Sequence, residues 1–336
     1  MKIAFYEIAE WEAKVIESKL TGHDLTFFPQ KFSDAALPAA DTEILSMFTG
    51  SPVTPKVLEA LPNLKMVATR TTGFDHINLQ AAKDKGVVVS NVPTYGQNTV
   101  AELAFALILA LSRKLYPAIK RVREQGLFSF DGLRGFDLAG KTLGVIGTGH
   151  IGAYAIKIAK GFSMEVVGYD PYPNEKLAAE YGFKYLSLDD LLAQSDIVTL
   201  HVPYMPATHH LINQDNIMKM KRGSILINTA RGPLVETSAL VAALRNGTLA
   251  GAGMDVIEEE GTITDELNIM ANGHPQEEQL KTVLADHELM QMENVVITPH
   301  MGAQTSEAIR RILETTITNI QAFVAGKPEN VVEVKA

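Results

Sequence analysis

The chain has 336 residues, of which 46% are hydrophobic and 21% charged, and its formal net charge is −9. This length exceeds what one hydrophobic core usually organises, so we expect two domains, and the acidic balance disfavours nucleic acid or an anionic membrane as a partner, because both select a basic surface. The absence of cysteine excludes disulfides, thiolate metal ligands and cysteine nucleophiles.

The first hundred residues predict an α/β unit. Five short β-rich runs are expected to be strands: KIAFYE, LTFF, EILSMF, KMVATR and GVVVS. Amphipathic segments such as EWEAKVIESKL and VTPKVLEAL lie between several of them. Strands and helices in alternation predict a parallel sheet with helices on both faces.

Neither a targeting segment nor a membrane span is expected. The N-terminal MKIAFYEIAEW contains glutamates where a signal peptide requires a long apolar run. The longest apolar stretch, LAFALILAL at residues 103–111, is too short to cross a bilayer. We therefore expect a cytoplasmic protein.

A domain boundary is expected near residue 98. Residues 91–97, NVPTYGQ, are rich in turn formers, and Thr99 and Glu102 fit a capping box with Thr99 as the N-cap of the next helix. That helix, AELAFALILALSRK, is apolar nearly all round, which requires burial against another domain or another subunit. The segment therefore indicates both a boundary and a dimer.

A second α/β series starts at Gly140. Its expected strands are KTLGVIG, MEVVGYD, DIVTLHVP, GSILINTA, AGAGMDV and NVVITPH, with helical segments between most of them. Residues 305–324 are expected to form one long helix. The pattern predicts a second parallel sheet with helices on its faces.

Gly147, Gly149 and Gly152 form the pattern G-x-G-x-x-G between an apolar strand, LGVIG, and a helix, HIGAYAIKIAKGF. The next strand ends in Asp170, eighteen residues after Gly152. These are the parts of a dinucleotide fingerprint, whose glycines let the backbone approach the pyrophosphate at the helix N-terminus. Asp170 would accept hydrogen bonds from the ribose hydroxyls and repel the extra phosphate of NADP. The sequence therefore predicts NAD as the cofactor.

Polar residues follow four of the expected strands, at the edge where an open parallel sheet binds its ligands. An arginine, a carboxylate and a histidine therefore converge on the edge that binds the cofactor. The residues are His201-Val202-Pro203 after IVTL, Arg231-Gly232 after SILINTA, Asp255 and Glu258-Glu259-Glu260 after AGAGM, and Pro299-His300 after VVIT.

This set of residues suits the reduction of a 2-oxo acid. Arginine binds the carboxylate and polarises the carbonyl, and histidine protonates the forming alkoxide. A nearby glutamate favours the imidazolium form and orients it, while hydride comes from the nicotinamide. Taken singly, each residue also has an ordinary structural explanation: Arg231 in a polar surface turn, His300 in a capped loop, and two of the three glutamates in solvent.

No metal site is expected. His209 and His210 are neighbours in the sequence, and adjacent side chains on a regular element diverge. The two histidines are therefore expected to be surface or structural residues.

Together these motifs resemble the D-specific 2-hydroxyacid dehydrogenases, most closely their D-lactate and D-2-hydroxyisocaproate branch. The resemblance covers essentially the whole chain and rests on NVPTYG, GVIGTGHIG, GYDPYP, LHVP, INTARGPLVET, MDVIEEE and ITPH. It implies two Rossmann-like, doubly wound domains with the active site in the cleft. Residues 1–98 and 301–336 would form a flavodoxin-like substrate domain, and residues 99–300 an inserted NAD-binding domain. The fingerprint comes late because its domain is the insert.

The resemblance also implies roles for individual residues of the second domain. The family's catalytic arginine matches Arg231, its acid–base histidine matches His300, and its glutamate, five residues after Asp255, matches Glu260. Asp255 matches a residue near the nicotinamide amide. The expected cofactor-binding residues are Gly147, Gly149, His150, Ile151, Gly152, Asp170, Val202, Pro203, Thr229, Ala230 and Asp255.

In the first domain the resemblance implies a substrate site. The backbone N–H groups of Thr72 and Gly73 would bind the substrate carboxylate together with Arg231 and His300. Phe48 and Tyr95 match pocket positions of the lactate branch, and core packing is the alternative for these two. The expected substrate-binding residues are Phe48, Thr72, Gly73, Tyr95, Arg231 and His300.

The residues after His300 depart from the lactate branch, which usually carries an aromatic pair there. Here Ala303 replaces an aromatic that would close the pocket, while Met301 could fill the space. A D-lactate dehydrogenase that reduces pyruvate is the expected activity. The alternative is reduction of 2-oxoisocaproate or another bulky 2-oxo acid, which an open pocket would favour.

A function of another class is an NAD-sensing, corepressor-like regulator on the same fold. Such a protein would keep much of the catalytic set, and the absence of a basic patch argues against it here. Turnover of any 2-oxo acid would separate the two functions. From the apolar helix and the resemblance we expect a homodimer.

Overall fold

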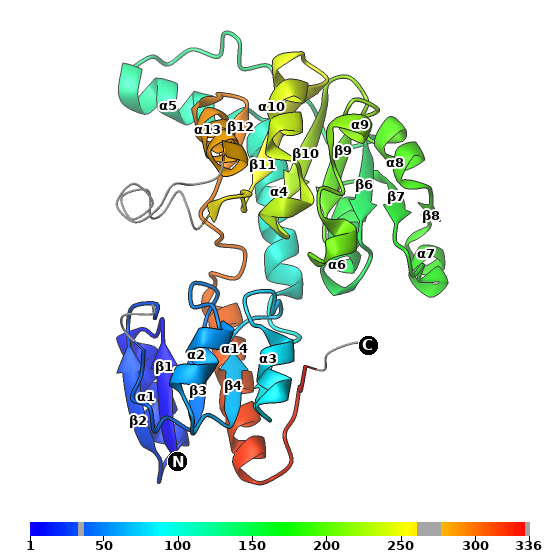
Figure 1. Ribbon diagram of the computed structural model, residues 1–336. Helices are drawn as coiled ribbons and strands as arrows, with labels where there is room; N and C mark the ends of the chain where they lie inside the picture. Colours follow the sequence, from blue (N-terminus) through cyan, green and yellow to red (C-terminus); the bar gives the residue numbers. More distant parts are fainter. Residues whose placement is uncertain (33–36, 261–276, 333–336) are drawn as a thin grey trace. The chain divides into compact units, whose positions relative to one another are not determined.

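The computed structural model describes residues 1–32, 37–260 and 277–332 (Figure 1). The chain divides into two compact units, one comprising Met1–Tyr95 with Gln304–Ala336 and the other Gly96–Ala303. Each unit contains one parallel sheet. The prediction of two parallel-sheet α/β domains is confirmed.

The first unit has a five-stranded sheet in the order β2-β1-β3-β4-β5, which is the order of flavodoxin-like folds. Strands β3 and β4 are buried along their whole length, as expected where helices cover both faces of a parallel sheet. The elements are β1 (Lys2–Tyr6), α1 (Glu10–Lys19), β2 (Asp24–Phe28), β3 (Ile44–Met47), α2 (Pro55–Ala60), β4 (Met66–Thr69), α3 (Leu79–Asp84), β5 (Val88–Ser90) and α14 (Ser306–Val324).

Helix α14 belongs to the first unit although it comes last in the chain. Its N-cap is Thr305, whose hydroxyl accepts a hydrogen bond from the amide of Ala308 at 3.2 Å. Leu313 and Ile317 on its apolar face pack in one cluster with Met66 of the sheet. The predicted helix at residues 305–324 is confirmed.

The second unit has a seven-stranded sheet in the order β12-β11-β10-β9-β6-β7-β8. The chain adds β7 and β8 on one side of β6 and then returns to build β9 to β12 on the other. The strand order therefore reverses between β6 and β9, and such a switch point is where this fold binds dinucleotides. The strands are β6 (Thr142–Ile146), β7 (Glu165–Tyr169), β8 (Lys184–Tyr185), β9 (Ile197–Leu200), β10 (Ser224–Asn228), β11 (Leu249–Met254) and β12 (Val295–Ile297).

Helices cover both faces of this sheet (Figure 1). Strand β8, which the sequence analysis missed, has only two residues and lies at the sheet edge, so it is too short to show a hydrophobic period. The helices are α4 (Gln97–Ser112), α5 (Leu115–Gln125), α6 (His150–Gly161), α7 (Glu175–Tyr181), α8 (Leu188–Gln194), α9 (Gln214–Ile217), α10 (Thr237–Arg245) and α13 (Glu277–Gln291), with 3-10 turns η1 (Pro206–Thr208) and η2 (Gly232–Leu234).

Helix α4 differs from its prediction in two ways. It begins at Gln97 with Gly96 as the N-cap, so that Thr99 is a buried residue inside the helix and the expected capping box is wrong. Its apolar surface packs on α6 and β11 of its own unit. A Cβ on Gly253 of β11 would come within 2.9 Å of Leu107, so a small strand residue lets the helix lie close. The burial of α4 therefore needs no second subunit.

None of the helices that the structure describes combines the length and the hydropathy needed to cross a membrane. Helix α4, the most apolar of the segments considered above, has 16 residues.

Candidate active site

The surroundings of the three glycines in the loop between β6 and α6 explain why side chains are absent there. Gly147 has φ +89°, and a Cβ there would lie 2.8 Å from the carbonyl carbon of His201. A Cβ on Gly152 would lie 2.0 Å from the carbonyl oxygen of Gly147, so its absence lets the helix pack on the strand. A Cβ on Gly149 would meet nothing within 4 Å. Gly149 thus leaves open space beside the N-terminus of α6.

The N-terminus of α6 offers backbone donors to an anion. No side chain caps it, His150 is exposed and Ile151 is half-buried. The first N–H groups of a helix have no partner within the helix, and the helix dipole favours negative charge there. With the open space at Gly149, this end of the helix fits the pyrophosphate of a dinucleotide.

Asp170 lies at the end of β7 and is tied to the glycine-rich loop. Its Oδ2 accepts hydrogen bonds from the amide of Thr148 at 2.7 Å and from the Thr148 hydroxyl at 3.1 Å, and its Oδ1 accepts one from the amide of Tyr172 at 2.9 Å. The Thr148 hydroxyl also contacts the phenol oxygen of Tyr185 at 2.7 Å. The carboxylate is therefore held in place, and its remaining lone pairs can accept further hydrogen bonds.

Two buried polar atoms at the ends of β9 and β10 have no hydrogen-bond partner among the described residues: Nδ1 of His201 and Oγ1 of Thr229. Burial lowers the pKa of His201 to about 4, so its ring is neutral near pH 7. Buried polar atoms without a partner call for an explanation, and a polar cofactor atom would satisfy them. Beside them, Val202 is buried, Pro203 exposed and Ala230 half-buried.

Arg231 follows β10 in a turn whose conformation depends on its neighbours Asn228 and Gly232. The side chain of Asn228 accepts from the amide of Ala230 at 3.0 Å and donates to the carbonyl of Arg231 at 2.8 Å. A Cβ on Gly232 would lie 1.8 Å from the carbonyl oxygen of Ile257, so only glycine lets these two backbones cross. The crossing brings the arginine turn against the segment that leads to Glu260.

His300 and Glu260 form a pair. Nδ1 of His300 lies 2.9 Å from Oε2 of Glu260, and both side chains are partly exposed. His300 has φ +51°, a left-handed conformation that is uncommon outside glycine and tends to occur at functional sites. Its amide donates to the carbonyls of Asp255 and Thr298 at 2.8 and 3.0 Å, which stabilises this conformation.

Asp255 organises the turn that carries His300. Its carboxylate accepts hydrogen bonds from the hydroxyl of Thr298 at 2.6 Å and from the amides of Met301 and Gly302 at 2.9 and 2.8 Å. Burial raises its pKa, and these hydrogen bonds oppose that rise. Asp255 thus anchors the turn of His300. Its expected place near the nicotinamide amide stays a prediction.

Residues 105–302 match the model of the D-isomer specific 2-hydroxyacid dehydrogenase family, NAD binding domain. The chain belongs to the D-isomer specific 2-hydroxyacid dehydrogenase family. It is 38% identical to an aromatic 2-oxoacid reductase of Clostridium sporogenes over 313 residues, covering 91% of this chain and 90% of that protein. It is 35% identical to D-lactate dehydrogenase of Escherichia coli over 332 residues, covering 97% and 98%.

The solved structure of D-lactate dehydrogenase from Aquifex aeolicus, complexed with NAD and lactic acid, matches the fold of this dehydrogenase with a TM-score of 0.87 at 35% identity. The match covers 99% of this chain and 100% of that one. The predicted family and cofactor are confirmed: this is a 2-hydroxyacid dehydrogenase that uses NAD.

In the first unit of this dehydrogenase, the turn after β4 presents two backbone amides. The hydroxyl of Thr72 donates to the carbonyl of Val92 and the side chain of Asn91 donates to the carbonyl of Thr72, both at 2.8 Å. Among the described contacts, the N–H groups of Thr72 and Gly73 donate to no protein acceptor. A rigid turn with two such donors is suited to a carboxylate.

Phe48 and Tyr95 also belong to the first unit, and both are half-buried. The guanidinium of the buried Arg70 lies 5.9 Å from the centre of the Phe48 ring, and Arg311 donates to the carbonyl of Tyr95 at 2.7 Å. Neither side chain belongs to the described hydrophobic clusters, and their role in substrate binding stays a prediction, with core packing as its alternative.

A cavity of about 600 Å³ opens in the second unit beside β12. Asp255, Glu260 and His300 contribute to its lining, together with Tyr116 and Lys120 of α5. Glu260 and His300, the pair expected from the sequence, therefore face this cavity, whereas Arg231 is not part of its lining. Among the described residues no group of acidic or histidine side chains is arranged to hold a metal ion.

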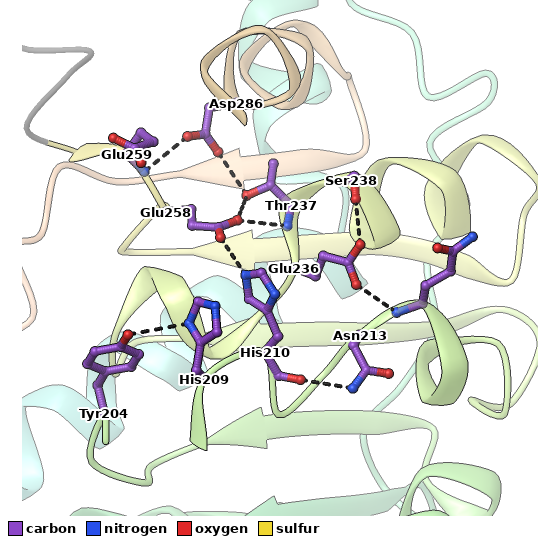
Figure 2. A network of polar contacts seen from close by, with 11 residues as sticks. Tyr204, His209, His210, Asn213, Glu236, Thr237, Ser238, Glu258, Glu259 and Asp286 are labelled. Atoms are coloured by element: carbon purple, nitrogen blue, oxygen red, sulfur yellow. Dashed lines mark hydrogen bonds and ion pairs between the residues drawn. The ribbon is translucent and has the colours of Figure 1, made fainter. Parts of the chain in front are cut away.

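Two expectations about neighbouring residues are wrong (Figure 2). Glu258 does not lie free in solvent: its carboxylate contacts His210 and Thr237. The rings of His209 and His210 do not diverge but stack with centroids 3.8 Å apart, because they lie in a loop where His210 has φ +49°. No sequence signal indicated the contacts of Glu258, since its partners lie on different elements.

Proposed function

We propose that this dehydrogenase is a D-lactate dehydrogenase, which reduces pyruvate to D-lactate with NADH. The contact of 2.9 Å between His300 and Glu260 carries the proposal, because a histidine paired with a carboxylate is the acid–base group that reduction of a carbonyl requires. The similarity over the full length to a D-lactate dehydrogenase structure supports pyruvate as the substrate.

The side chains have distinct roles in this proposal. Arg231 binds the substrate carboxylate and polarises the carbonyl oxygen. Glu260 accepts the Nδ1–H of His300, which leaves the Nε2–H to be donated to the forming alkoxide. The bound cofactor supplies the hydride. Asp255, through the turn that it anchors, keeps His300 in its left-handed conformation.

The remaining predicted residues bind substrate or cofactor in the same proposal. The amides of Thr72 and Gly73 bind the substrate carboxylate, and Phe48 and Tyr95 contact the rest of the substrate. Asp170 accepts hydrogen bonds from the adenine-ribose hydroxyls, and its charge selects against the extra phosphate of NADP. The pyrophosphate is bound by the loop and helix start formed by Gly147, Gly149, His150, Ile151 and Gly152, while Val202, Pro203, Thr229, Ala230 and Asp255 line the cofactor site.

A second candidate is a reductase of bulky or aromatic 2-oxo acids. Two observations favour it: the 38% identity to an aromatic 2-oxoacid reductase, and Ala303, which stands where the resemblance implies an aromatic side chain that would close the pocket. In this alternative the chemistry is the same, and only the size of the preferred side chain changes.

The test is NADH consumption with pyruvate, hydroxypyruvate, 2-oxoisocaproate, phenylpyruvate and glyoxylate, compared by kcat/KM. A maximum at pyruvate supports the D-lactate dehydrogenase. A maximum at phenylpyruvate or 2-oxoisocaproate replaces it by the second candidate. No turnover of any of the five substrates would refute both dehydrogenase candidates and would favour the NAD-sensing regulator instead.

We further propose that the protein is a homodimer that associates through α5 and the segment after it. Leu115, Ile119 and Val122 are spaced along one face of α5 and are each about half exposed, and no residue of this helix is buried. Phe128 and Phe130 are 98% and 86% exposed. Apolar surface of this extent marks an association site. Ile119→Glu should shift the mass measured by light scattering from dimer to monomer, whereas Glu124→Gln should not.

A further inference from the structure

A chain of polar contacts lies outside the His300–Glu260 pair (Figure 2). The side chain of Glu258 is only 13% exposed, and its Oε1 lies 2.5 Å from Nε2 of His210. Its Oε2 accepts hydrogen bonds from the amide and the hydroxyl of Thr237, at 3.1 and 2.8 Å. Glu258 thus joins the loop after β9, the start of α10 and the turn after β11.

The hydroxyl of Thr237 also lies 3.2 Å from Oδ1 of the fully buried Asp286 on α13. A hydroxyl has one hydrogen to donate, yet this one is near the oxygens of two carboxyl groups. The contacts are all satisfied when Asp286 carries a proton and donates to Thr237, which in turn donates to Glu258. Burial raises the pKa of Asp286 to about 6, so this order of donors applies below that pH.

The same contacts hold the acidic turn next to the pair. The other oxygen of Asp286 accepts from the amide of Glu259 at 3.2 Å, and the carboxylate of Glu260 contacts the amide of Ile257 at 3.3 Å as well as His300. Glu258 and Glu259 are therefore attached to α10 and α13, and the next residue faces His300.

We propose that Glu258 is a positioning residue: through His210 and Thr237 it fixes the turn of residues 257–260 so that Glu260 stays in contact with His300. This rests on the proposed function, which gives Glu260 and His300 their roles. The charged and titratable groups around Glu258 are His209, stacked on His210, with Asp286 and Glu259.

The test is Glu258→Gln with Glu236→Gln as the matched control. Glu236 precedes Thr237 and accepts hydrogen bonds from the amide of Gln214 and the hydroxyl of Ser238, and none of its described side-chain contacts is with the acidic turn. Glutamine at position 258 would present an amide donor to His210 or Thr237, which are donors themselves. We expect kcat to fall about tenfold, as coupling within a polar network allows, with the midpoint of the pH profile for reduction shifted to lower pH. The control should change neither.

A double-mutant cycle identifies the route of the effect. In the Glu260→Gln background, Glu258→Gln should change kcat less than about twofold, because the pair that it positions is already lost. An undiminished tenfold loss in that background would overturn the proposal. His210→Gln, which keeps a donor for Glu258, should retain activity, whereas His210→Ala should behave like Glu258→Gln.

An NMR titration of the His300 ring in the protein without substrate separates this proposal from the proposed function, because it needs no turnover. Glu258→Gln should move the ring's titration in the same direction as Glu260→Gln. If Glu258→Gln lowers only the thermal stability and leaves the titration of the ring as in the wild type, Glu258 is a structural residue and the proposal fails.

Discussion

Replacing Asp286 by asparagine tests the assignment of a proton to this buried carboxyl. Asparagine keeps the shape of the side chain, and its amide can donate to the hydroxyl of Thr237 while its oxygen accepts from the amide of Glu259. These are the contacts that a protonated Asp286 makes. The variant therefore imitates the protonated form at every pH.

The magnitude follows from the shift in pKa. Burial raises the pKa of Asp286 from 3.8 to about 6 in the folded protein, so the folded state binds the proton more tightly than the unfolded state. The corresponding stability is fully present below pH 4 and is lost as the pH rises through 6. A difference of about two units corresponds to roughly 3 kcal/mol. Asp286→Asn should therefore be more stable than the wild type by up to about 3 kcal/mol at pH 8, and by about half of that at pH 5.

The measurement is urea unfolding of both proteins at pH 5 and pH 8, followed through the transition of the second unit. Asp137→Asn, an exposed aspartate in the same unit, is the matched control and should leave the free energy of unfolding unchanged at both values. A variant that is less stable than the wild type at pH 8, or one that gains the same stability at pH 5 and pH 8, would refute the assignment of a proton to Asp286.

Three further substitutions test the site. His300→Gln should lower kcat by about two to four orders of magnitude, the usual scale for loss of a general acid, while NADH binding measured by fluorescence stays within about twofold; turnover near the wild-type rate would reject His300 as the proton donor. Asp170→Ala should raise kcat/KM with NADPH relative to NADH, and a wild-type enzyme that already prefers NADPH would contradict the role of Asp170. Gly232→Ala should reduce activity and stability together, because the new Cβ would lie 1.8 Å from the carbonyl oxygen of Ile257; an unchanged melting temperature would show that the two backbones separate freely.

The sequence by itself determined the described strands except β8, together with the residues at their ends. Parallel strands buried on both faces are nearly continuous apolar runs, so segments such as KMVATR and SILINTA were recognisable without their neighbours. The glycine-rich loop was equally local, since its strand, its glycines and its helix are consecutive. The strand ends then brought Arg231, Glu260 and His300 to one edge, because that follows from a parallel sheet.

Only the tertiary structure decided which side chains meet across elements. The acidic run is three consecutive glutamates in the sequence, and nothing in it distinguishes Glu258, bound by His210, from an exposed residue. Asp286 lies within a helix whose pattern gives no sign of a buried carboxyl, and its proton depends on Thr237 and Glu259 from other elements. The apolar surface of helix α4 indicated a subunit interface in the sequence, whereas in the structure it is covered by β11 and α6 of its own unit. The reason is physical: hydrophobic periodicity records whether a residue is buried, whereas hydrogen bonds, protonation and the identity of a packing partner depend on atoms far away in the chain.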